Sequence, residues 1–321
     1  MSSSEGLSRR RVAGLARRDS ADTRTASGSG ENGAGGRPGA RSGAGNADAG
    51  QDIDQYAPRL TLMDEVVLLG LKEKEGYLSF WNDSISYVLR GCILAELALR
   101  GRIAIVREGA AFRRENTPLA ERPIEVIDGR PTGEVLLDEA LRIIKSGDRA
   151  SISNWINFLS GETWNITKIS YQLKQVRERL AKGLVDKGVL RTEKRNFLLF
   201  DMATHPVQDT AARRAVVQKC IDLVLARAPP VADDPAPDYL LRRVVFVCAA
   251  FAANVLENAL PMLEFEAREA CYAKADVLIA EYGQWPMPES VTRELDQYLS
   301  RECLEAVAGV LSVYARMDSV L

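Results

Sequence analysis

The sequence contains a single histidine, His205, among its 321 residues. General acid–base catalysis most often recruits histidine, and a nucleophilic serine or cysteine usually needs an adjacent base. The motifs of P-loop nucleoside triphosphatases, zinc proteases and serine hydrolases are also missing from the sequence. Because His205 precedes Pro206 at the end of a predicted hairpin strand, we interpret it as a structural turn residue. The sequence therefore predicts no catalytic residue and no enzyme.

Long apolar runs are missing as well. The most apolar stretch, residues 244–253, is too short for a bilayer, because a spanning helix needs about 20 apolar residues. No apolar run follows the arginines near the N-terminus, so no secretory signal peptide is expected. The 5 cysteines are far apart and have no metal-ligand spacing: Cys92, Cys220, Cys248, Cys271 and Cys303. We therefore expect no metal site, no disulfide framework and a reducing compartment such as the cytoplasm.

Residues 1–58 lack lysine altogether and lack aromatic residues before Tyr56. The segment is rich in glycine, and it cannot bury enough apolar surface to offset the entropy of ordering. We expect a disordered arm. Its GxGxxG sequence, residues 28–33, has no strand before it and no helix after it, which excludes a dinucleotide site. Near its start lies a small basic cluster that contains Arg9, Arg10 and Arg11.

From Leu60 onward, apolar residues recur at three- and four-residue steps, which is typical of buried helix faces. Thr61, Thr132 and Ser151 are predicted N-caps, and glycines follow several predicted helices. Short strands are expected at 103–106, at 124–127 and in a hairpin between about 189 and 205. The expected helices are about 62–69, 82–100, 133–145, 152–160, 165–187, 210–227, 238–259, 262–282, 290–299 and 302–319. The predicted fold class is mainly α: one helical domain, residues 59–321, with small β-hairpins, preceded by the arm.

Helix 165–187 has the clearest pattern. One stripe of apolar residues is expected to be buried: Ile166, Ile169, Leu173, Val176, Leu180 and Leu184. The opposite face carries Lys174 and Arg177, which are three residues apart and could converge on one anion. The alternative is an ordinary solvated face, because Glu178 lies there too. Spacing alone leaves both interpretations open.

Two further apolar features can each be interpreted in two ways, as part of the core or as a contact surface. Trp81 follows Phe80 at a predicted helix entry, where tryptophan is usually part of the core but, if exposed, suits a membrane interface. Phe197, Leu198, Leu199 and Phe200 form an apolar run in a hairpin, and alternate strand residues point to opposite faces. Half of this run must therefore meet a second layer, a partner subunit or a lipid surface.

Several longer segments resemble the Golgi phosphoprotein 3 family. The similarity covers essentially all of 59–321 and is strongest in 60–71, 79–84, 89–92, 96–101, 133–140, 159–165, 176–182 and 196–206. Residues 151–156 and 315–321 most resemble the fungal members, the vacuolar-sorting adaptors of yeasts. The resemblance implies a non-enzymatic helical adaptor that is peripheral to the cytosolic face of the Golgi membrane.

The resemblance also implies partners and sites. The family's phosphoinositide-binding positions, which hold phosphatidylinositol 4-phosphate, correspond here to Trp81, Arg90, Lys174 and Arg177. The hairpin around 191–205, with Phe197–Phe200 at its tip, corresponds to one used for oligomerisation or membrane contact. Arg9, Arg10 and Arg11 match an arginine cluster that contacts the COPI coatomer. Family members bind the cytosolic tails of glycosyltransferases and link them to this coat, which retains the enzymes in the Golgi.

One alternative function stays open. Helix 165–187, Gly188 and the following hairpin have the outline of a winged-helix nucleic-acid-binding protein. However, a net charge of −2 does not provide the broad basic face that duplex DNA demands. We therefore expect no nucleic acid among the partners.

Overall fold

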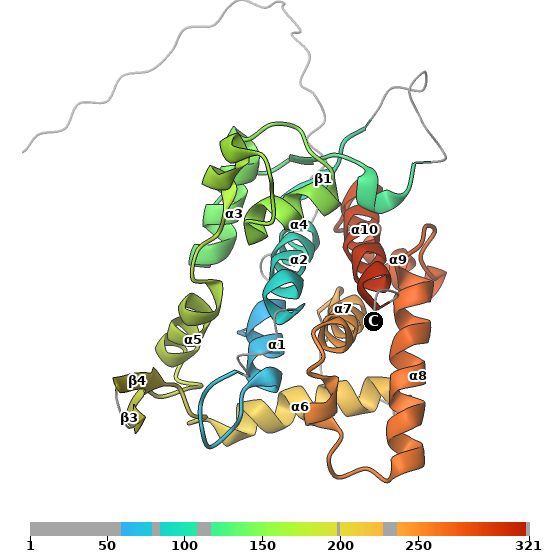
Figure 1. Ribbon diagram of the computed structural model, residues 1–321. Helices are drawn as coiled ribbons and strands as arrows, with labels where there is room; N and C mark the ends of the chain where they lie inside the picture. Colours follow the sequence, from blue (N-terminus) through green and yellow to red (C-terminus); the bar gives the residue numbers. More distant parts are fainter. Residues whose placement is uncertain (1–58, 79–83, 108–116, 198–199, 227–235, 319–321) are drawn as a thin grey trace, which may run out of the picture. The chain divides into compact units, whose positions relative to one another are not determined.

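The structure is a computed structural model that describes residues 59–78, 84–107, 117–197, 200–226 and 236–318. For residues 195, 197 and 200–202 only the backbone is described. The predicted arm, 1–58, lies outside the described residues. The account below concerns the helical unit to which the described residues belong (Figure 1).

The prediction of a mainly α fold with small β-hairpins is confirmed. The α-helices are α1 (Leu62–Gly70), α2 (Ser84–Leu99), α3 (Val135–Ser146), α4 (Ile152–Ser160), α5 (Val176–Asp186), α6 (Thr210–Val224), α7 (Tyr239–Ala252), α8 (Phe265–Tyr282), α9 (Glu289–Leu295) and α10 (Arg301–Asp318). Short 3-10 helices are η2 (Leu119–Glu121), η3 (Ile166–Tyr171) and η4 (Leu256–Ala259). The strands are β1 (Ile103–Ile105), β2 (Ile124–Val126), β3 (Glu193–Phe197) and β4 (Phe200–Thr204).

Two of the three predicted N-caps are confirmed. Thr61 and Asp64 form a reciprocal capping box at α1, and the Ser151 hydroxyl accepts the Asn154 N–H at α4. The prediction that Thr132 caps α3 is wrong, because Glu134 occupies the N-cap position. The Thr132 hydroxyl instead donates to the Asp138 carboxylate at 2.8 Å and accepts the Glu134 N–H at 3.2 Å.

Helices α2 and α7 form the inside of the domain. From Val88 to Leu99 every residue of α2 is buried, and α7 is buried from Leu241 to Ala250. Helices α1, α4, α8 and α10 pack around this pair (Figure 1). The apolar run at 244–253 is therefore a core helix, as predicted. None of the helices within the described residues is long and apolar enough to cross a membrane.

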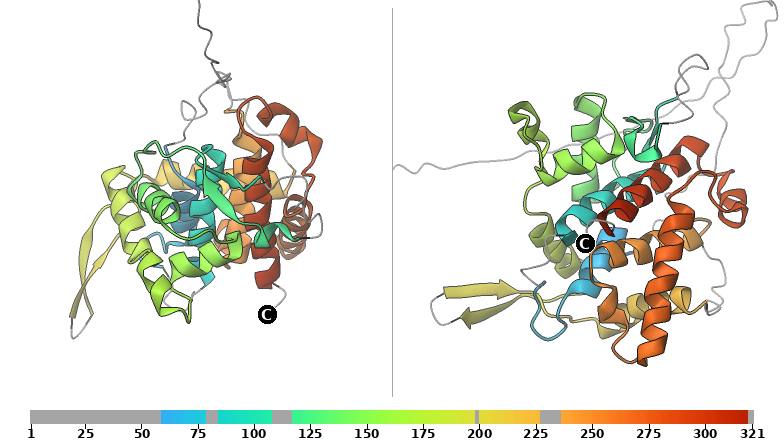
Figure 2. Two further views of the ribbon diagram at one scale, coloured as in Figure 1. Left: turned by 90° about the horizontal axis from the view of Figure 1, so that it is seen from above. Right: turned by 45° about the vertical axis from the view of Figure 1, so that its right-hand side comes forward.

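The strands form two separate antiparallel pairs. Strand β1 pairs with β2, and β3 pairs with β4 from Glu193 opposite Thr204 to Phe197 opposite Phe200. The second pair is a hairpin that projects away from the helices (Figures 1 and 2). Its base rests against Gly76, whose carbonyl accepts the His205 N–H at 2.7 Å. Only glycine fits there, because its φ is +71° and a Cβ would lie 2.2 Å from the Pro206 nitrogen.

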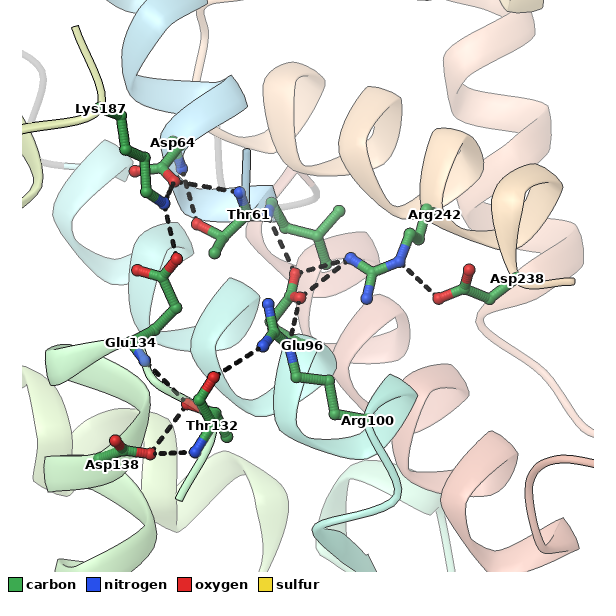
Figure 3. A network of polar contacts seen from close by, with 11 residues as sticks. Thr61, Asp64, Glu96, Arg100, Thr132, Glu134, Asp138, Lys187, Asp238 and Arg242 are labelled. Atoms are coloured by element: carbon green, nitrogen blue, oxygen red, sulfur yellow. Dashed lines mark hydrogen bonds and ion pairs between the residues drawn. The ribbon is translucent and has the colours of Figure 1, made fainter. Parts of the chain in front are cut away.

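A charged network ties the inner helices together (Figure 3). The Glu96 side chain of α2 is 0% exposed. Its carboxylate accepts from Arg242 of α7 at 2.9 and 3.0 Å, from Arg100 at 2.8 Å and from the Leu62 N–H at 3.1 Å. Arg242 also pairs with Asp238 in front of α7. One carboxylate thereby fixes three helices, α1, α2 and α7, relative to one another.

The network extends to the surface through Lys187, which caps the C-terminal end of α5. The Lys187 ammonium donates to Asp64 at the start of α1 and to Glu134 before α3, in both cases at 2.7 Å. Figure 3 shows these contacts beside the Glu96 group. Helix α5 is therefore held in place by contacts to two other helix starts.

Burial would raise the pKa of the Glu96 carboxyl, but Arg242, Arg100 and the Leu62 N–H outweigh burial and lower the pKa from 4.5 to about 2. A carboxyl with a lowered pKa stabilises the fold above its unfolded-state pKa. That contribution is lost as the pH falls from about 4.5 toward 2.

We predict that Glu96→Gln lowers the free energy of unfolding by about 3–5 kcal/mol at neutral pH, because it leaves buried guanidinium groups without their counter-charge. The amide is similar in size and can still accept the Leu62 N–H, so the change isolates the charge. The difference from the wild type should shrink as the pH falls from about 4.5 toward 2, where the wild-type carboxyl also becomes neutral. Urea denaturation at several pH values measures both effects.

Glu289→Gln is the matched control, because Glu289 and Arg293 form an exposed ion pair on α9. Its effect should stay below about 0.5 kcal/mol. Equal stability losses in the two variants would show that the Glu96 network does not organise the core.

Candidate functional site

Arg90 lies on α2 at the point where three chain segments meet. Its side chain is only 7% exposed. Its guanidinium donates to the carbonyl oxygens of Ser86 at 2.7 Å, Leu159 at 3.3 Å and Leu173 at 2.9 Å. Leu159 is in the last turn of α4, and Leu173 precedes α5. Arg90 therefore holds together two segments that are remote from α2 in the sequence.

The segment between Leu159 and Leu173 is a loop whose two ends are hydrogen-bonded to each other. The Leu173 N–H donates to the Leu159 carbonyl at 3.0 Å, and the Gln172 amide donates to the Ser160 carbonyl at 3.3 Å. Residues 160–172, which we call the 160–172 loop, therefore leave and re-enter the domain at one place. The middle of the loop forms the 3-10 helix η3.

The prediction of one continuous helix over 165–187 is wrong. The chain forms η3 up to Tyr171, then turns, and α5 begins only at Val176. The turn includes Gln175, whose φ of 53° and ψ of 39° are left-handed and end any helical path. The pairing of Leu173 with Leu159 and Arg90 holds the chain in this turn.

The predicted apolar stripe is split by the turn. The other predicted members are buried, as expected: Leu173, Val176, Leu180 and Leu184. Ile166 and Ile169, however, are 82% and 48% exposed. Trp164, which precedes them, is fully exposed. Sequence periodicity did not identify this exposed group, although Gly161, which ends α4, and Asn165, which caps η3, are both turn signals.

Lys174 and Arg177 flank the start of α5. Lys174 is exposed in the turn, directly after the Leu173 carbonyl that Arg90 binds, and Arg177 is half-buried in the first turn of α5. Burial and the nearby positive charge of Arg177 lower the pKa of Arg90 to about 10, whereas Glu162 and Glu178 act in the opposite direction. The structure thus brings Arg90 and Arg177 together and places Lys174 in the turn beside them, so that the three are arranged by a turn rather than by helical spacing.

The first turn of α5 adds to the positive potential. No side chain caps this helix start, although the N-cap residue is Gln175. The first amide groups of a helix and its macrodipole favour an anion at this position. We call Arg90, Lys174, Arg177 and this helix start the cationic cluster. Its residue types fit a phosphate group, because lysine acts as a point charge and arginine as a planar donor.

The other predicted site residues lie wholly or partly outside the described residues. Trp81 lies outside the described residues, a short distance before Ser84 begins α2. Arg9, Arg10 and Arg11 lie outside them as well. The predicted hairpin is present as β3 and β4, but Leu198, Leu199 and the side chains of Phe197 and Phe200 are outside the description.

The structure also places the residues considered for catalysis or metal binding. His205 follows β4, and burial lowers the pKa of its imidazole. Its Nδ1 lies 3.4 Å from the Thr192 hydroxyl. All five cysteines are within the described residues; they are buried and form no disulfide. Over the same part of the chain, no group of three histidine, cysteine or acidic residues could hold a metal ion.

The described residues thus form a helical domain with an apolar core and a buried ion network around Glu96. The domain also has a projecting hairpin and a cationic cluster next to a loop with exposed apolar side chains. Residues 62–298 match the family model of Golgi phosphoprotein 3 (GPP34). The chain belongs to the Golgi phosphoprotein 3 family.

Two fungal relatives agree with this assignment. Vacuolar protein sorting-associated protein 74 of Schizosaccharomyces pombe is 48% identical over 295 residues, which is 84% of this chain and 87% of the relative. The protein of the same name from Eremothecium gossypii is 49% identical over 284 residues, which is 82% of this chain and 85% of the relative. The similarity to fungal members seen in the sequence is thereby confirmed.

We predict that Arg90→Lys lowers the free energy of unfolding by about 1–3 kcal/mol. A lysine keeps the positive charge, but its single ammonium cannot bind the carbonyls of Ser86, Leu159 and Leu173 together. Arg293→Lys on α9 is the control, because Arg293 is exposed and should tolerate the change. If Arg90→Lys unfolds at the same denaturant concentration as the wild type, Arg90 does not hold the two ends of the loop.

Proposed function

We propose that this protein is a peripheral Golgi membrane adaptor that binds phosphatidylinositol 4-phosphate on the cytosolic face. The family description, Golgi phosphoprotein 3, supports a Golgi-associated role. The name of the two relatives, vacuolar protein sorting-associated protein 74, supports a role in protein sorting. In this proposal the protein acts by binding, without catalysis and without a cofactor.

The observation that carries the proposal is the meeting of Arg90, Lys174 and Arg177 at the uncapped start of α5. A phosphate monoester carries up to two negative charges and several acceptor oxygens, which suit a lysine, an arginine and the start of a helix together. Lys174 and Arg177 are the contacting residues in this proposal. Arg90 supports the site from beneath, because it is largely buried and bound to carbonyls. Trp81, which precedes α2, completes the site.

The proposal extends to three protein contacts. The adaptor binds the cytosolic tails of glycosyltransferases and, through Arg9, Arg10 and Arg11, the COPI coatomer, so that these enzymes are retained in the Golgi. The hairpin with Phe197–Phe200 at its tip serves homo-oligomer formation or membrane contact. The projection of β3 and β4 away from the helices supports a role for the hairpin in contacts beyond the domain (Figure 2).

Nucleic-acid binding by a winged-helix element is not favoured by any specific observation. The predicted recognition helix 165–187 is reduced to α5, Val176–Asp186. Its Arg179 is already paired with Glu139. A DNA gel shift is still a useful negative control in the experiment below.

We predict that Lys174→Ala combined with Arg177→Ala weakens binding to liposomes that contain phosphatidylinositol 4-phosphate by about ten- to a hundredfold. Each cation near an anionic membrane surface contributes on the order of 1 kcal/mol, and a tenfold change corresponds to about 1.4 kcal/mol. Circular dichroism should be unchanged, because neither residue is part of the core. Liposome sedimentation over a range of lipid concentrations measures the effect.

The matched control is Arg268→Ala combined with Lys274→Ala on α8, which lies on the other side of the domain from α5 (Figure 1). This pair removes the same charge and should leave binding nearly unchanged. If the two double variants bind the liposomes equally well, the cationic cluster is not the lipid site.

We predict that changing Arg9, Arg10 and Arg11 together to alanine reduces coatomer recovery in a pull-down by at least about tenfold, because a short basic motif binds an acidic partner mainly through its charges. Liposome binding should stay close to that of the wild type. The control changes Arg17 and Arg18, which lie in the same basic region, to alanine. Equal recovery with all three proteins would reject the coat-binding role of the first cluster.

A further inference from the structure

The 160–172 loop carries the most exposed large apolar side chains near the cationic cluster. Trp164 is fully exposed, Ile166 is 82% exposed and Ile169 is 48% exposed. Residues three apart in a 3-10 helix lie on the same face, so Ile166 and Ile169 share one face of η3. A tryptophan and two isoleucines in water are unfavourable unless another surface covers them.

These side chains are exposed although the loop itself is packed. On its inner side, Tyr171 lies 5.5 Å from the buried Trp155 ring and 6.0 Å from Phe158, measured between ring centroids. The Lys168 ammonium lies 5.1 Å from the Tyr171 ring and also pairs with Asp148. The backbone closure at Leu159 and Leu173 fixes both ends of the loop. The packed inner side and the hydrogen-bonded ends of the loop therefore leave Trp164 on its outer side.

The charges at the base of the loop indicate what covers it. Lys174 is the second residue after the loop, and Arg177 lies in the first turn of α5. The loop itself holds one acid and one base, Glu162 and Lys168, so it carries no net charge. An exposed apolar loop next to a cationic cluster in the chain matches the chemistry of a lipid surface, where acyl chains lie beneath phosphates. A basic peptide would be repelled by the same cluster.

We infer that the 160–172 loop inserts Trp164 and Ile166 into the interfacial region of an anionic bilayer while the cationic cluster binds headgroup phosphates. This inference rests on the proposed lipid-binding function and adds a second, apolar contact to it. Membrane binding then needs both contacts: the phosphate contact selects the lipid, and the apolar contact requires an intact bilayer. A headgroup free in solution engages the first contact alone.

The test uses the full chain with Trp164→Ala combined with Ile166→Ser. Binding to phosphatidylcholine vesicles that contain phosphatidylinositol 4-phosphate should weaken by about ten- to a hundredfold, because the apolar area of a large side chain no longer leaves water. Binding of a short-chain, water-soluble phosphatidylinositol 4-phosphate should stay within about twofold of the wild type, since the phosphate contact is intact. Met262→Ser combined with Phe265→Ser is the control, because this pair is comparably exposed at the start of α8. It should bind vesicles like the wild type.

A fluorescence experiment reports insertion directly. Vesicles with brominated acyl chains should quench the wild-type emission, and they should quench Trp164→Phe clearly less while this variant keeps most of its binding. Using phosphatidylserine as the anionic lipid makes this readout independent of phosphoinositide selectivity. If quenching is observed but vesicles with phosphatidylinositol 4-phosphate bind no better than vesicles with phosphatidylserine, the proposed function fails and the insertion stands.

Three results would overturn the inference. The first is equal vesicle binding by the wild type and the Trp164→Ala, Ile166→Ser variant. The second is an equal loss of soluble-lipid and vesicle binding, which would make the loop a support for the headgroup site. The third is a smaller oligomer mass in light scattering with unchanged vesicle binding, which would make a second copy of the chain the partner of the loop.

Discussion

The ion cluster around Glu96 is the contact on which the arrangement of the domain depends. An isolated carboxylate at 0% exposure would be strongly unfavourable, yet Arg242, Arg100 and the Leu62 N–H all bind it. Apolar packing alone tolerates many rotations and shifts between helices such as α2 and α7. A buried charge that needs three donors tolerates few, because each shift would leave a charge unpaired. The cluster therefore fixes where α2 stands, and Arg90 is on α2.

The position of α5 follows from α2 and α1. Arg90 holds the chain that enters α5 through the Leu173 carbonyl, and Lys187 binds Asp64 and Glu134 at the other end of the helix. Both ends of α5 are thus attached to elements that Glu96 organises, as Figure 3 shows for the Lys187 end. In the proposed site, the attached α5 holds Arg177 and the amide groups of its first turn at one place. Such preorganisation lowers the entropic cost of binding an anion.

Sequence reasoning predicted the fold well wherever the local signal and the tertiary contacts agree. The N-cap Thr61 and the recurring apolar residues of α2 and α7 could be read directly from the chain. The Glu96–Arg242 contact could not, because it joins residues 146 positions apart and periodicity carries no information on long-range pairing. For the same reason, only part of the candidate site could be predicted from the sequence. Lys174 and Arg177 could be identified as neighbours, whereas the role of Arg90 as a clamp depends on carbonyls of two other segments.

The error at 165–187 has a physical cause that bears on function. Ile166 and Ile169 continue the helical period of Leu173 and Val176, so the pattern predicts one buried face, and a straight helix would satisfy it. The structure instead adopts a left-handed conformation at Gln175, which costs a non-glycine residue about 1–2 kcal/mol. It also leaves two isoleucines and Trp164 in water. Both costs destabilise the folded state. The hydrogen bonds of Arg90 with the Leu159 and Leu173 carbonyls help to offset them. A conformation held against its local preference, next to a cationic cluster, is expected where a surface is shaped for binding.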